Sequence, residues 1–251
     1  MVWSIAAFSS EIRGGVDILT MANLSTIAPG QSLDDVTAWE AAYSRFETPE
    51  QETKKFIRRL IAMGALSWGR EYEIVELFCG RGNGLVALAK LGFSRIEGVD
   101  LSPSLLSQYS GPAHCHAADC RALPFEDDSK DVIIIQGGLH HLQTLPEDLD
   151  RCLSEMHRVL KANGKVLIVE PWLTPFLSFV HWVCGRKTAR WLFSKIDSLA
   201  TMIEHERKTY HQWLRQPGWV LNALDRYFVR EHSACRWGKL MFAGRKRNGM
   251  G

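Results

Sequence analysis

The pattern of apolar and polar residues changes near residue 73. Beyond this point, short apolar runs alternate with stretches of helical period, which predicts a parallel sheet with helices between its strands. The run Val132-Ile133-Ile134-Ile135 is apolar on both faces, as expected of a central strand covered on both sides. The predicted strands are 74–78, 96–99, 132–135 and 166–169, and the predicted helices are 84–91, 103–109 and 147–160.

The first 70 residues favour helices over strands, so we expect a helical N-terminal extension or cap over 1–70. Its first 31 residues show no sustained period, so we expect a loosely structured leader or a short packed arm there. Ser32 can cap a helix that places Trp39, Tyr43 and Phe46 on one face. Such an aromatic stripe is expected to cover another element.

A second helix of this extension has clear end signals. Thr48 supplies a capping hydroxyl, Pro49 stands at the first helical position, and Gln51 completes a capping box. The pattern predicts that this helix ends near Gly64.

The last third of the chain predicts an insert and a hairpin. About 55 residues separate the strand 166–169 from Tyr227, more than a crossover helix needs, so we expect a helical lid or substrate insert over 172–222. Two strands, 227–232 and 239–243, then predict a terminal hairpin. The fold class is therefore α/β, with a doubly wound, Rossmann-like, mostly parallel sheet and a terminal antiparallel hairpin strand.

The composition excludes several classes of protein. Apolar residues make up 46% and charged residues 23% of the chain, which is typical of a globular domain and not of a disordered or polytopic membrane chain. The formal charge of +2 does not favour nucleic acid as a partner. The six cysteines lack CxxC spacing and no basic segment precedes the apolar start, which favours the reducing cytoplasm.

A glycine-rich segment follows the first strand of the sheet and opens the next helix. It reads Glu76-Leu77-Phe78-Cys79-Gly80-Arg81-Gly82-Asn83-Gly84. Glycines allow the backbone to turn tightly and approach a ligand. Asp100 ends the next strand, where a carboxylate can accept hydrogen bonds from both ribose hydroxyls of a nucleotide. The arrangement predicts a nucleotide-type cofactor site.

This segment resembles the first motif of class I methyltransferases, which use S-adenosyl-L-methionine, and more narrowly a type 11 methyltransferase-like domain. The motif reads acid, any residue, glycine, any residue, glycine, any residue, glycine, and Glu76, Gly80 and Gly82 match it. Phe78 stands where the first glycine usually lies, which affects the backbone near the methionine end of the cofactor. The segment 98–103 resembles the second motif, with Asp100 as the ribose acid.

Later segments resemble the remaining motifs in the family's order, so the resemblance covers about residues 70–171. It implies that Asp119 accepts from the adenine amine and that Gln136 ends a strand under the methionine part. It also implies a methyltransferase domain over 71–251. The cofactor-binding residues that it implies are Glu76, Phe78, Cys79, Gly80, Gly82, Asp100, Leu101, Asp119, Cys120 and Gln136.

The catalytic candidates lie in the loop after Gln136. A methyl group on a sulfonium is already activated, so such an enzyme mainly aligns the reacting atoms and excludes water. Where the acceptor is a hydroxyl or an amine, His140 or His141 could remove the proton. Alternatively, one histidine packs under the cofactor and the other caps a helix. Glu170 follows a strand end, where carboxylates also serve to position ligands.

The insert is rich in aromatic residues with cations between them. We interpret it as a substrate lid whose tryptophans form a small core of their own. Its apolar run 172–184 is only 13 residues long, too short to cross a bilayer. A helix lying in the headgroup region is the alternative, with a peripheral membrane contact through 172–195 and a lipid-linked acceptor. The segment 204–208 has the pattern of a solvated helical face.

No metal site is predicted. His114, Cys115, His116 and Cys120 lie within seven residues, but alternation along a strand sends neighbours to opposite faces. No second ligand pair stands at a structural-zinc spacing.

The leading hypothesis is methyl transfer from S-adenosyl-L-methionine to a small-molecule, glycan or lipid-linked acceptor in the cytoplasm, or at the inner face of the membrane. The alternatives are a nucleic-acid methyltransferase, which the near-neutral charge disfavours, and a non-catalytic scaffold or regulator that binds the cofactor. The acceptor atom and the oligomeric state stay open, because this fold serves many chemistries.

Overall fold

A seven-stranded sheet forms the centre of the computed structural model, which describes residues 41–43 and 45–249. The strand order is β3-β2-β1-β4-β5-β7-β6. Strands β1 to β5 pair in parallel, whereas β7 is antiparallel to β5 and β6 is antiparallel to β7. The predicted fold class is therefore confirmed. The strands are β1 (Ile74–Leu77), β2 (Ile96–Asp100), β3 (His114–Ala117), β4 (Lys130–Gln136), β5 (Leu160–Pro171), β6 (Phe228–Arg236) and β7 (Lys239–Lys246).

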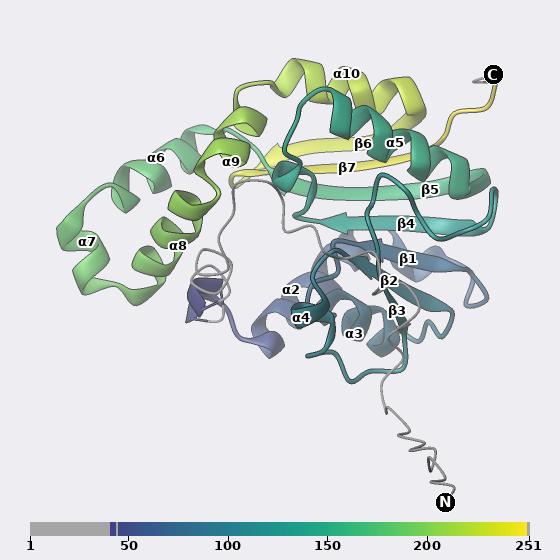
Figure 1. Ribbon diagram of the computed structural model, residues 1–251, viewed down its shortest axis with the longest axis horizontal. Helices are drawn as coiled ribbons and strands as arrows, with labels where there is room; N and C mark the ends of the chain where they lie inside the picture. The colour runs from purple at the N-terminus through teal and green to yellow at the C-terminus, as the bar shows by residue number, and fades with distance from the viewer. Residues whose placement is uncertain (1–40, 44, 250–251) are drawn as a thin grey trace, which may run out of the picture.

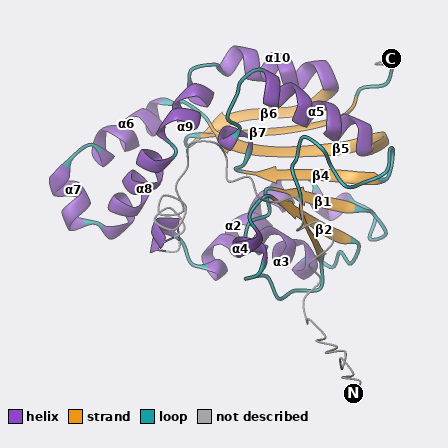
Figure 2. Ribbon diagram, viewed as in Figure 1, coloured by secondary structure: helices purple, strands orange, loops and turns teal. Residues whose placement is uncertain are grey.

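Helices cover both faces of this sheet (Figures 1 and 2). On one face, α5 (Glu147–Val159) and α10 (Pro217–Tyr227) pack against Ile133 and Ile135 of β4. On the other, α2 (Pro49–Ala62) and α3 (Asn83–Lys90) join a second apolar cluster with the alternate residues Val132 and Ile134. All four of these β4 side chains are at most 1% exposed, which confirms the central strand predicted from the apolar run.

Helix α2 begins where its capping signals predict. The Thr48 hydroxyl accepts from the Gln51 N–H, and the Gln51 side chain accepts from the Thr48 N–H, so the capping box is formed. The helix ends at Ala62, and Gly64 follows with a φ of +89°. The expected helix after Ser32 lies almost wholly outside the described residues, as does the expected irregular segment 1–31.

Two elements differ from the sequence-based expectation. Strand β3 does not appear among the predicted apolar runs, because the sequence of this short strand, His-Cys-His-Ala, alternates polar with small residues. Helix α4 (Pro103–Leu106) is one turn long rather than the predicted 103–109. The predicted C-terminal hairpin is present, and its turn places Trp237 and Gly238 at φ values of 51° and 72°.

The insert after β5 is helical, as expected, and α6, α7 and α8 extend away from the sheet (Figure 1). The expectation that the tryptophans of the insert form a small core of their own is wrong. Trp213 is fully buried and Trp172 nearly so, but both join the main core. Trp182 and Trp191 are instead 56% and 84% exposed. No helix among the described residues is long and apolar enough to span a bilayer. The helices are α6 (Pro175–Cys184), α7 (Lys187–Leu192), α8 (Ser194–His205) and α9 (Arg207–Leu214), followed by α10.

Candidate functional site

The cofactor residues predicted from the sequence meet at the carboxyl ends of the parallel strands, where doubly wound sheets bind ligands. Asp100, at the end of β2, accepts hydrogen bonds from the N–H groups of Gly80 at 2.7 Å and Ser102 at 2.8 Å. These bonds fix the carboxylate beside the glycine-rich loop. The neighbouring Leu101 is 47% exposed, so it offers an apolar surface at the same edge.

The loop after β1 has the left-handed backbone that its glycines allow. Gly80 and Gly82 have φ values of 53° and 78°. Phe78 adopts the same region at 57°, so a bulky side chain occupies a conformation that usually belongs to glycine. Its ring lies against Gly138 of the loop after β4, where an added Cβ would come within 2.2 Å of the ring. Phe78 therefore takes a left-handed backbone conformation, and its ring packs against Gly138.

Glu76 and Gln136 form a buried acceptor pair between β1 and β4. The Gln136 amide donates to Glu76 Oε1 at 3.3 Å, while Glu76 Oε2 and Gln136 Oε1 have no hydrogen-bond partner among the described residues. Burial raises the pKa of Glu76 to about 8, despite the opposing hydrogen bond from Gln136. A cationic ammonium group placed here would satisfy both orphaned oxygens, so the pair fits the amino group of S-adenosyl-L-methionine.

Asp119 lies in the loop after β3, next to Asp100 in space, since the Ala118 N–H donates to the Asp100 carbonyl at 3.1 Å. Both oxygens of its carboxylate accept from the Arg121 guanidinium, the shortest contact being 2.6 Å, and Arg121 also bonds Asp148 of α5. Burial raises the pKa of Asp119, but Arg121 outweighs it and lowers the pKa. An adenine amine that donates a hydrogen bond to Asp119 would therefore have to use a carboxylate oxygen that already accepts from Arg121.

The two cysteines implied by the resemblance, Cys79 and Cys120, are 7% and 8% exposed. The Cys79 N–H donates to the Val99 carbonyl at 3.2 Å, which joins the glycine-rich loop to β2. Cys79 and Cys120 belong to the two different apolar clusters of the core, so neither lies on an open surface.

The N-terminal extension forms hydrogen bonds with the glycine-rich loop. Glu52 of α2 is only 4% exposed and accepts from Asn83 at 2.7 Å and from Arg81 at 3.3 Å. The Tyr43 hydroxyl donates to the same carboxylate, and the Arg81 guanidinium lies 4.6 Å from the Tyr43 ring centre. The sequence gives no signal of this long-range contact, because Glu52 lies in the first turn of a helix with an ordinary capping pattern.

A second polar cluster follows β4. His140 and His141 lie on the short 3-10 helix Leu139–His141, with their ring centres 4.1 Å apart. Behind His140, the fully buried Glu170 of β5 bonds the His140 Nδ1 at 2.7 Å and accepts from the N–H groups of Gly138 and Leu139 at 2.8 Å. Glu170 therefore fixes both the loop and the ring, which is a positioning role.

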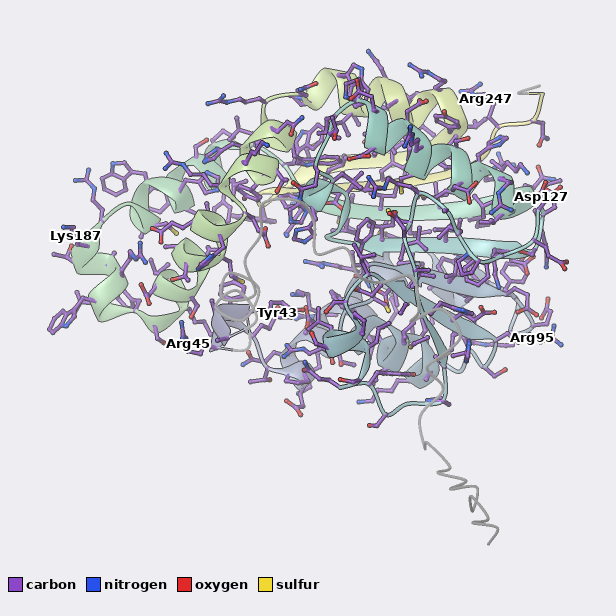
Figure 3. The ribbon with its side chains drawn as sticks, viewed as in Figure 1. Tyr43, Arg45, Arg95, Asp127, Lys187 and Arg247 are labelled. Atoms are coloured by element: carbon purple, nitrogen blue, oxygen red, sulfur yellow. The ribbon has the colours of Figure 1, made fainter. Side chains whose placement is uncertain are left out.

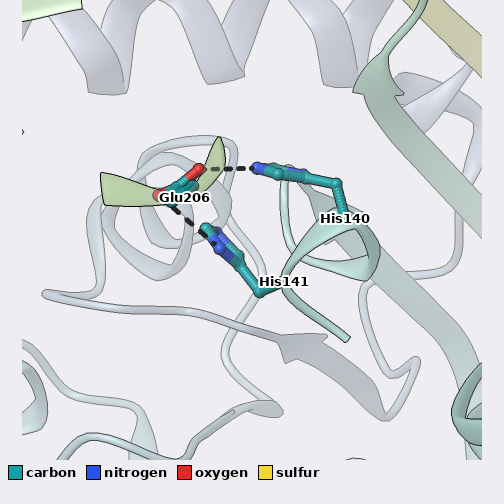
Figure 4. Close-up of side chains that lie close together, drawn as sticks. All are labelled: His140, His141 and Glu206. Atoms are coloured by element: carbon teal, nitrogen blue, oxygen red, sulfur yellow. Dashed lines mark ion pairs between the residues drawn. The ribbon is translucent and has the colours of Figure 1, made fainter. Parts of the chain in front are cut away.

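Glu206 completes this cluster from the junction between α8 and α9. Its two oxygens lie 3.5 Å from His140 Nε2 and 3.6 Å from His141 Nδ1 (Figure 4). The predicted solvated face of 204–208 is wrong for Glu206, whose side chain is 12% exposed. Only the packing of the insert over the loop after β4 brings this carboxylate to the histidines.

The carboxylates make this cluster strongly attractive to positive charge. Burial lowers the pKa of His140, but Glu170 and Glu206 outweigh it and raise the pKa to about 9. Burial lowers the pKa of His141, with His140 adding to the effect, although 35% of its side chain reaches the surface. Burial raises the pKa of Glu170, but His140 and the two backbone donors lower it overall.

Comparison with known proteins supports the resemblance seen in the sequence. Residues 75–168 match the family model described as a methyltransferase domain. A ubiquinone/menaquinone biosynthesis C-methyltransferase from Rubrivivax gelatinosus is 28% identical over 160 residues, which cover 60% of this chain and 61% of that relative. Matches to this and other curated relatives cover only 40–61% of their length.

Solved structures share the fold. The PH0226 protein from Pyrococcus horikoshii aligns with a TM-score of 0.61 at 18% identity, covering 82% of this chain and 97% of that one. A geranyl diphosphate C-methyltransferase from Streptomyces coelicolor, solved with S-adenosyl-L-homocysteine, aligns with a TM-score of 0.54 at 17% identity, covering 94% and 90%. Residues 75–168 therefore match a methyltransferase domain, and the chain shares the fold of these two solved structures.

Proposed function

We propose that this protein transfers a methyl group from S-adenosyl-L-methionine to an apolar, hydroxyl-bearing small molecule of the quinol type. The observation that carries the proposal is the adjacency of two sites at one sheet edge. The acceptor pair Glu76 and Gln136 fits the methionine end of the cofactor, and the cluster of His140, His141 and Glu206 begins only four residues after Gln136. A methyl donor and a polar group that binds the acceptor would thus lie side by side.

The roles of the predicted cofactor residues follow from their positions. Asp100 would accept from the ribose hydroxyls, while Gly80 and Gly82 let the backbone approach the cofactor. Glu76 and Gln136 would hold the ammonium group, and Phe78 with Gly138 would exclude water beneath the methyl group. When bound, S-adenosyl-L-methionine supplies an activated methyl group on a sulfonium.

The acceptor's chemistry suggests how the polar cluster would act. A ring carbon next to a deprotonated hydroxyl is a strong nucleophile, so transfer of the hydroxyl proton to His141, whose pKa is lowered, would prepare the acceptor. With the cofactor bound, its sulfur would keep the electron pair of the methyl–sulfur bond as the ring carbon takes the methyl group, and the ring carbon would then lose its own proton to water. The protein's contribution is alignment, because the donor is already activated.

The comparisons favour an apolar acceptor over a polymer. The curated relative is named for C-methylation in quinone biosynthesis, and the structural neighbour for C-methylation of geranyl diphosphate. In this chain, the insert exposes Phe179, Trp182 and Trp191 by 59%, 56% and 84%. Such exposed aromatic side chains suit a ligand or surface that is itself apolar.

We also propose that the insert contacts a membrane through 172–195. The Arg186 guanidinium lies 4.4 Å from the Trp182 ring centre, so aromatic and cationic groups share this surface. Lys187 lies at the outer end of the insert (Figure 3). Aromatic residues beside cations are typical of interfacial helices on anionic lipid, from which an apolar acceptor could be taken up.

A methyl-transfer assay with labelled S-adenosyl-L-methionine tests the function. The purified full chain would be offered a short-chain demethylated quinol, total RNA and a protein mixture in separate reactions. We expect label only in the quinol, as one methyl group on a ring carbon by mass spectrometry. Label in RNA or protein instead, or no label although the cofactor binds, would overturn the proposed acceptor class.

A further inference from the structure

The triad of His140, His141 and Glu206 has the composition of an open metal site. Its three candidate ligand atoms, His140 Nε2, His141 Nδ1 and a Glu206 oxygen, all lie within 4.8 Å of one another. Two imidazole nitrogens and one carboxylate form the ligand set of several catalytic zinc sites, which leave a fourth position for water or substrate. Figure 4 shows both rings turned toward the same carboxylate.

The distances suit coordination better than direct hydrogen bonding. The Glu206 oxygens lie 3.5 Å and 3.6 Å from the two ring nitrogens, whereas good hydrogen bonds to nitrogen are about 2.7–3.2 Å long. Zinc–ligand bonds of about 2.0–2.1 Å in a tetrahedron separate neighbouring ligand atoms by roughly 3.3–3.4 Å. The two distances end at different oxygens of Glu206, and all three ligand atoms lie within 4.8 Å of one another, so modest shifts of these side chains would bring them around one ion.

Glu170 supplies the support that metal-binding histidines usually have. It bonds the Nδ1 of His140 at 2.7 Å, which leaves Nε2 as the nitrogen that faces Glu206. A carboxylate behind a ligand histidine fixes the ring orientation and raises its basicity. Glu170 also holds the N–H groups of Gly138 and Leu139, so the loop that carries both histidines is preorganised.

We propose that His140 Nε2, His141 Nδ1 and Glu206 bind one divalent transition-metal ion of the zinc type. The nitrogen donors favour zinc or a similar ion over magnesium, which prefers an all-oxygen shell. The ion would offset the charge of the Glu206 carboxylate, whose side chain is only 12% exposed. If the proposed function holds, the open position binds the acceptor's hydroxyl oxygen and favours its deprotonated form.

The ion would also connect the insert to the loop that follows β4. His140 and His141 come from the loop after β4, whereas Glu206 comes from the insert between α8 and α9. Metal binding is therefore expected to stabilise the insert against the sheet, because an ion that binds only the folded state raises its stability. This effect needs neither cofactor nor acceptor.

The test is a calorimetric titration of the full chain with Zn²⁺, after removal of metal by a chelator and without cofactor or acceptor. We expect one ion per chain and a higher melting temperature with Zn²⁺. Co²⁺ should give the visible absorption of a tetrahedral site with nitrogen and oxygen ligands. Because these readouts do not involve methyl transfer, their failure would leave the proposed function untouched.

Three variants assign the site. Glu206→Gln keeps the shape of the side chain and His141→Ala removes one ligand, so both should lose stoichiometric binding and the cobalt absorption. Glu170→Gln should weaken binding by about 10–100-fold, as loss of an outer carboxylate does elsewhere. His232→Ala, which removes an exposed histidine on β6, should bind like the wild type. No binding by the wild type, or equal binding by Glu206→Gln and His141→Ala, would overturn the proposal.

Discussion

The buried carboxylate of Glu170 on β5 bonds the Nδ1 of His140 at 2.7 Å, across a sequence separation of 30 residues. This contact joins the loop that follows β4 to the adjacent strand. The second oxygen of the Glu170 carboxylate accepts hydrogen bonds from the backbone N–H groups of Gly138 and Leu139. Since no part of Glu170 is exposed, all three hydrogen bonds are shielded from water. They are expected to be costly to remove.

Replacing Glu170 should therefore lower stability. In Glu170→Gln, an amide NH₂ takes the place of one accepting oxygen, so a buried donor loses its partner and the free energy of unfolding should fall by about 1–3 kcal/mol. Urea denaturation at neutral pH measures this change. The matched control is Asp127→Asn, whose side chain is 72% exposed and pairs with Arg158, and which should change stability by at most about 0.5 kcal/mol. Equal effects of the two variants would contradict the role of Glu170.

A second prediction concerns Gly84 at the start of α3. A Cβ at this position would lie 2.0 Å from Glu76 Oε1, so Gly84→Ala should displace the Glu76 carboxylate and weaken binding of S-adenosyl-L-methionine. Gly218→Ala in α10 is the control, because nothing lies within 4 Å of its added Cβ. The control should bind normally and gain about 0.4–1 kcal/mol of stability. Normal binding of S-adenosyl-L-methionine by Gly84→Ala would contradict the proposed role of Glu76 in the cofactor site.

A third prediction concerns Glu97 and acid. Burial raises the pKa of Glu97, but hydrogen bonds from His116 and Lys130 outweigh it and lower the pKa from 4.5 to about 2. The unfolded chain therefore binds this proton first as pH falls, so the stabilisation from Glu97 is full above about pH 4.5 and declines toward pH 2. Denaturant midpoints of wild type and Glu97→Gln should converge over this range. A difference independent of pH would contradict this linkage.

A fourth prediction tests the membrane contact. Vesicles that contain phosphatidylglycerol should bind the full chain, and added salt should weaken the binding. Replacing both Trp182 and Trp191 by alanine should reduce partitioning by about tenfold or more, because two large apolar side chains no longer insert. Leu66→Ala is the control, since Leu66 is 59% exposed but lies outside the insert. Flotation unchanged in the double variant would exclude the insert as the contact.

Local patterns predicted most of the fold. The run Val132-Ile133-Ile134-Ile135 indicated the central strand because both of its faces are buried, and the Thr48–Gln51 box located the start of α2. Strand β3 was missed since its four residues carry little hydrophobic signal. Its place comes instead from parallel pairing with β2.

The sequence likewise predicts some residues of the candidate site and not others. Glycine and acid positions along consecutive strands located Asp100 and Glu76, because parallel topology brings strand ends to one edge. The histidine pair was also found as a candidate. Glu206 was missed because its sequence neighbourhood is highly charged and only the fold of the insert buries it. Trp191 is exposed, whereas tryptophan is usually largely buried. An expectation based on residue type alone therefore places it in a core.

The most direct test of the account is a calorimetric titration of the full chain with S-adenosyl-L-methionine. Wild-type protein should bind one molecule per chain, and Asp100→Asn should bind about 10–100-fold more weakly because a charged acceptor is lost. Asp225→Asn, in a surface pair with Arg230, should bind normally. No binding by folded wild type, or unchanged binding by Asp100→Asn, would contradict the proposed cofactor site.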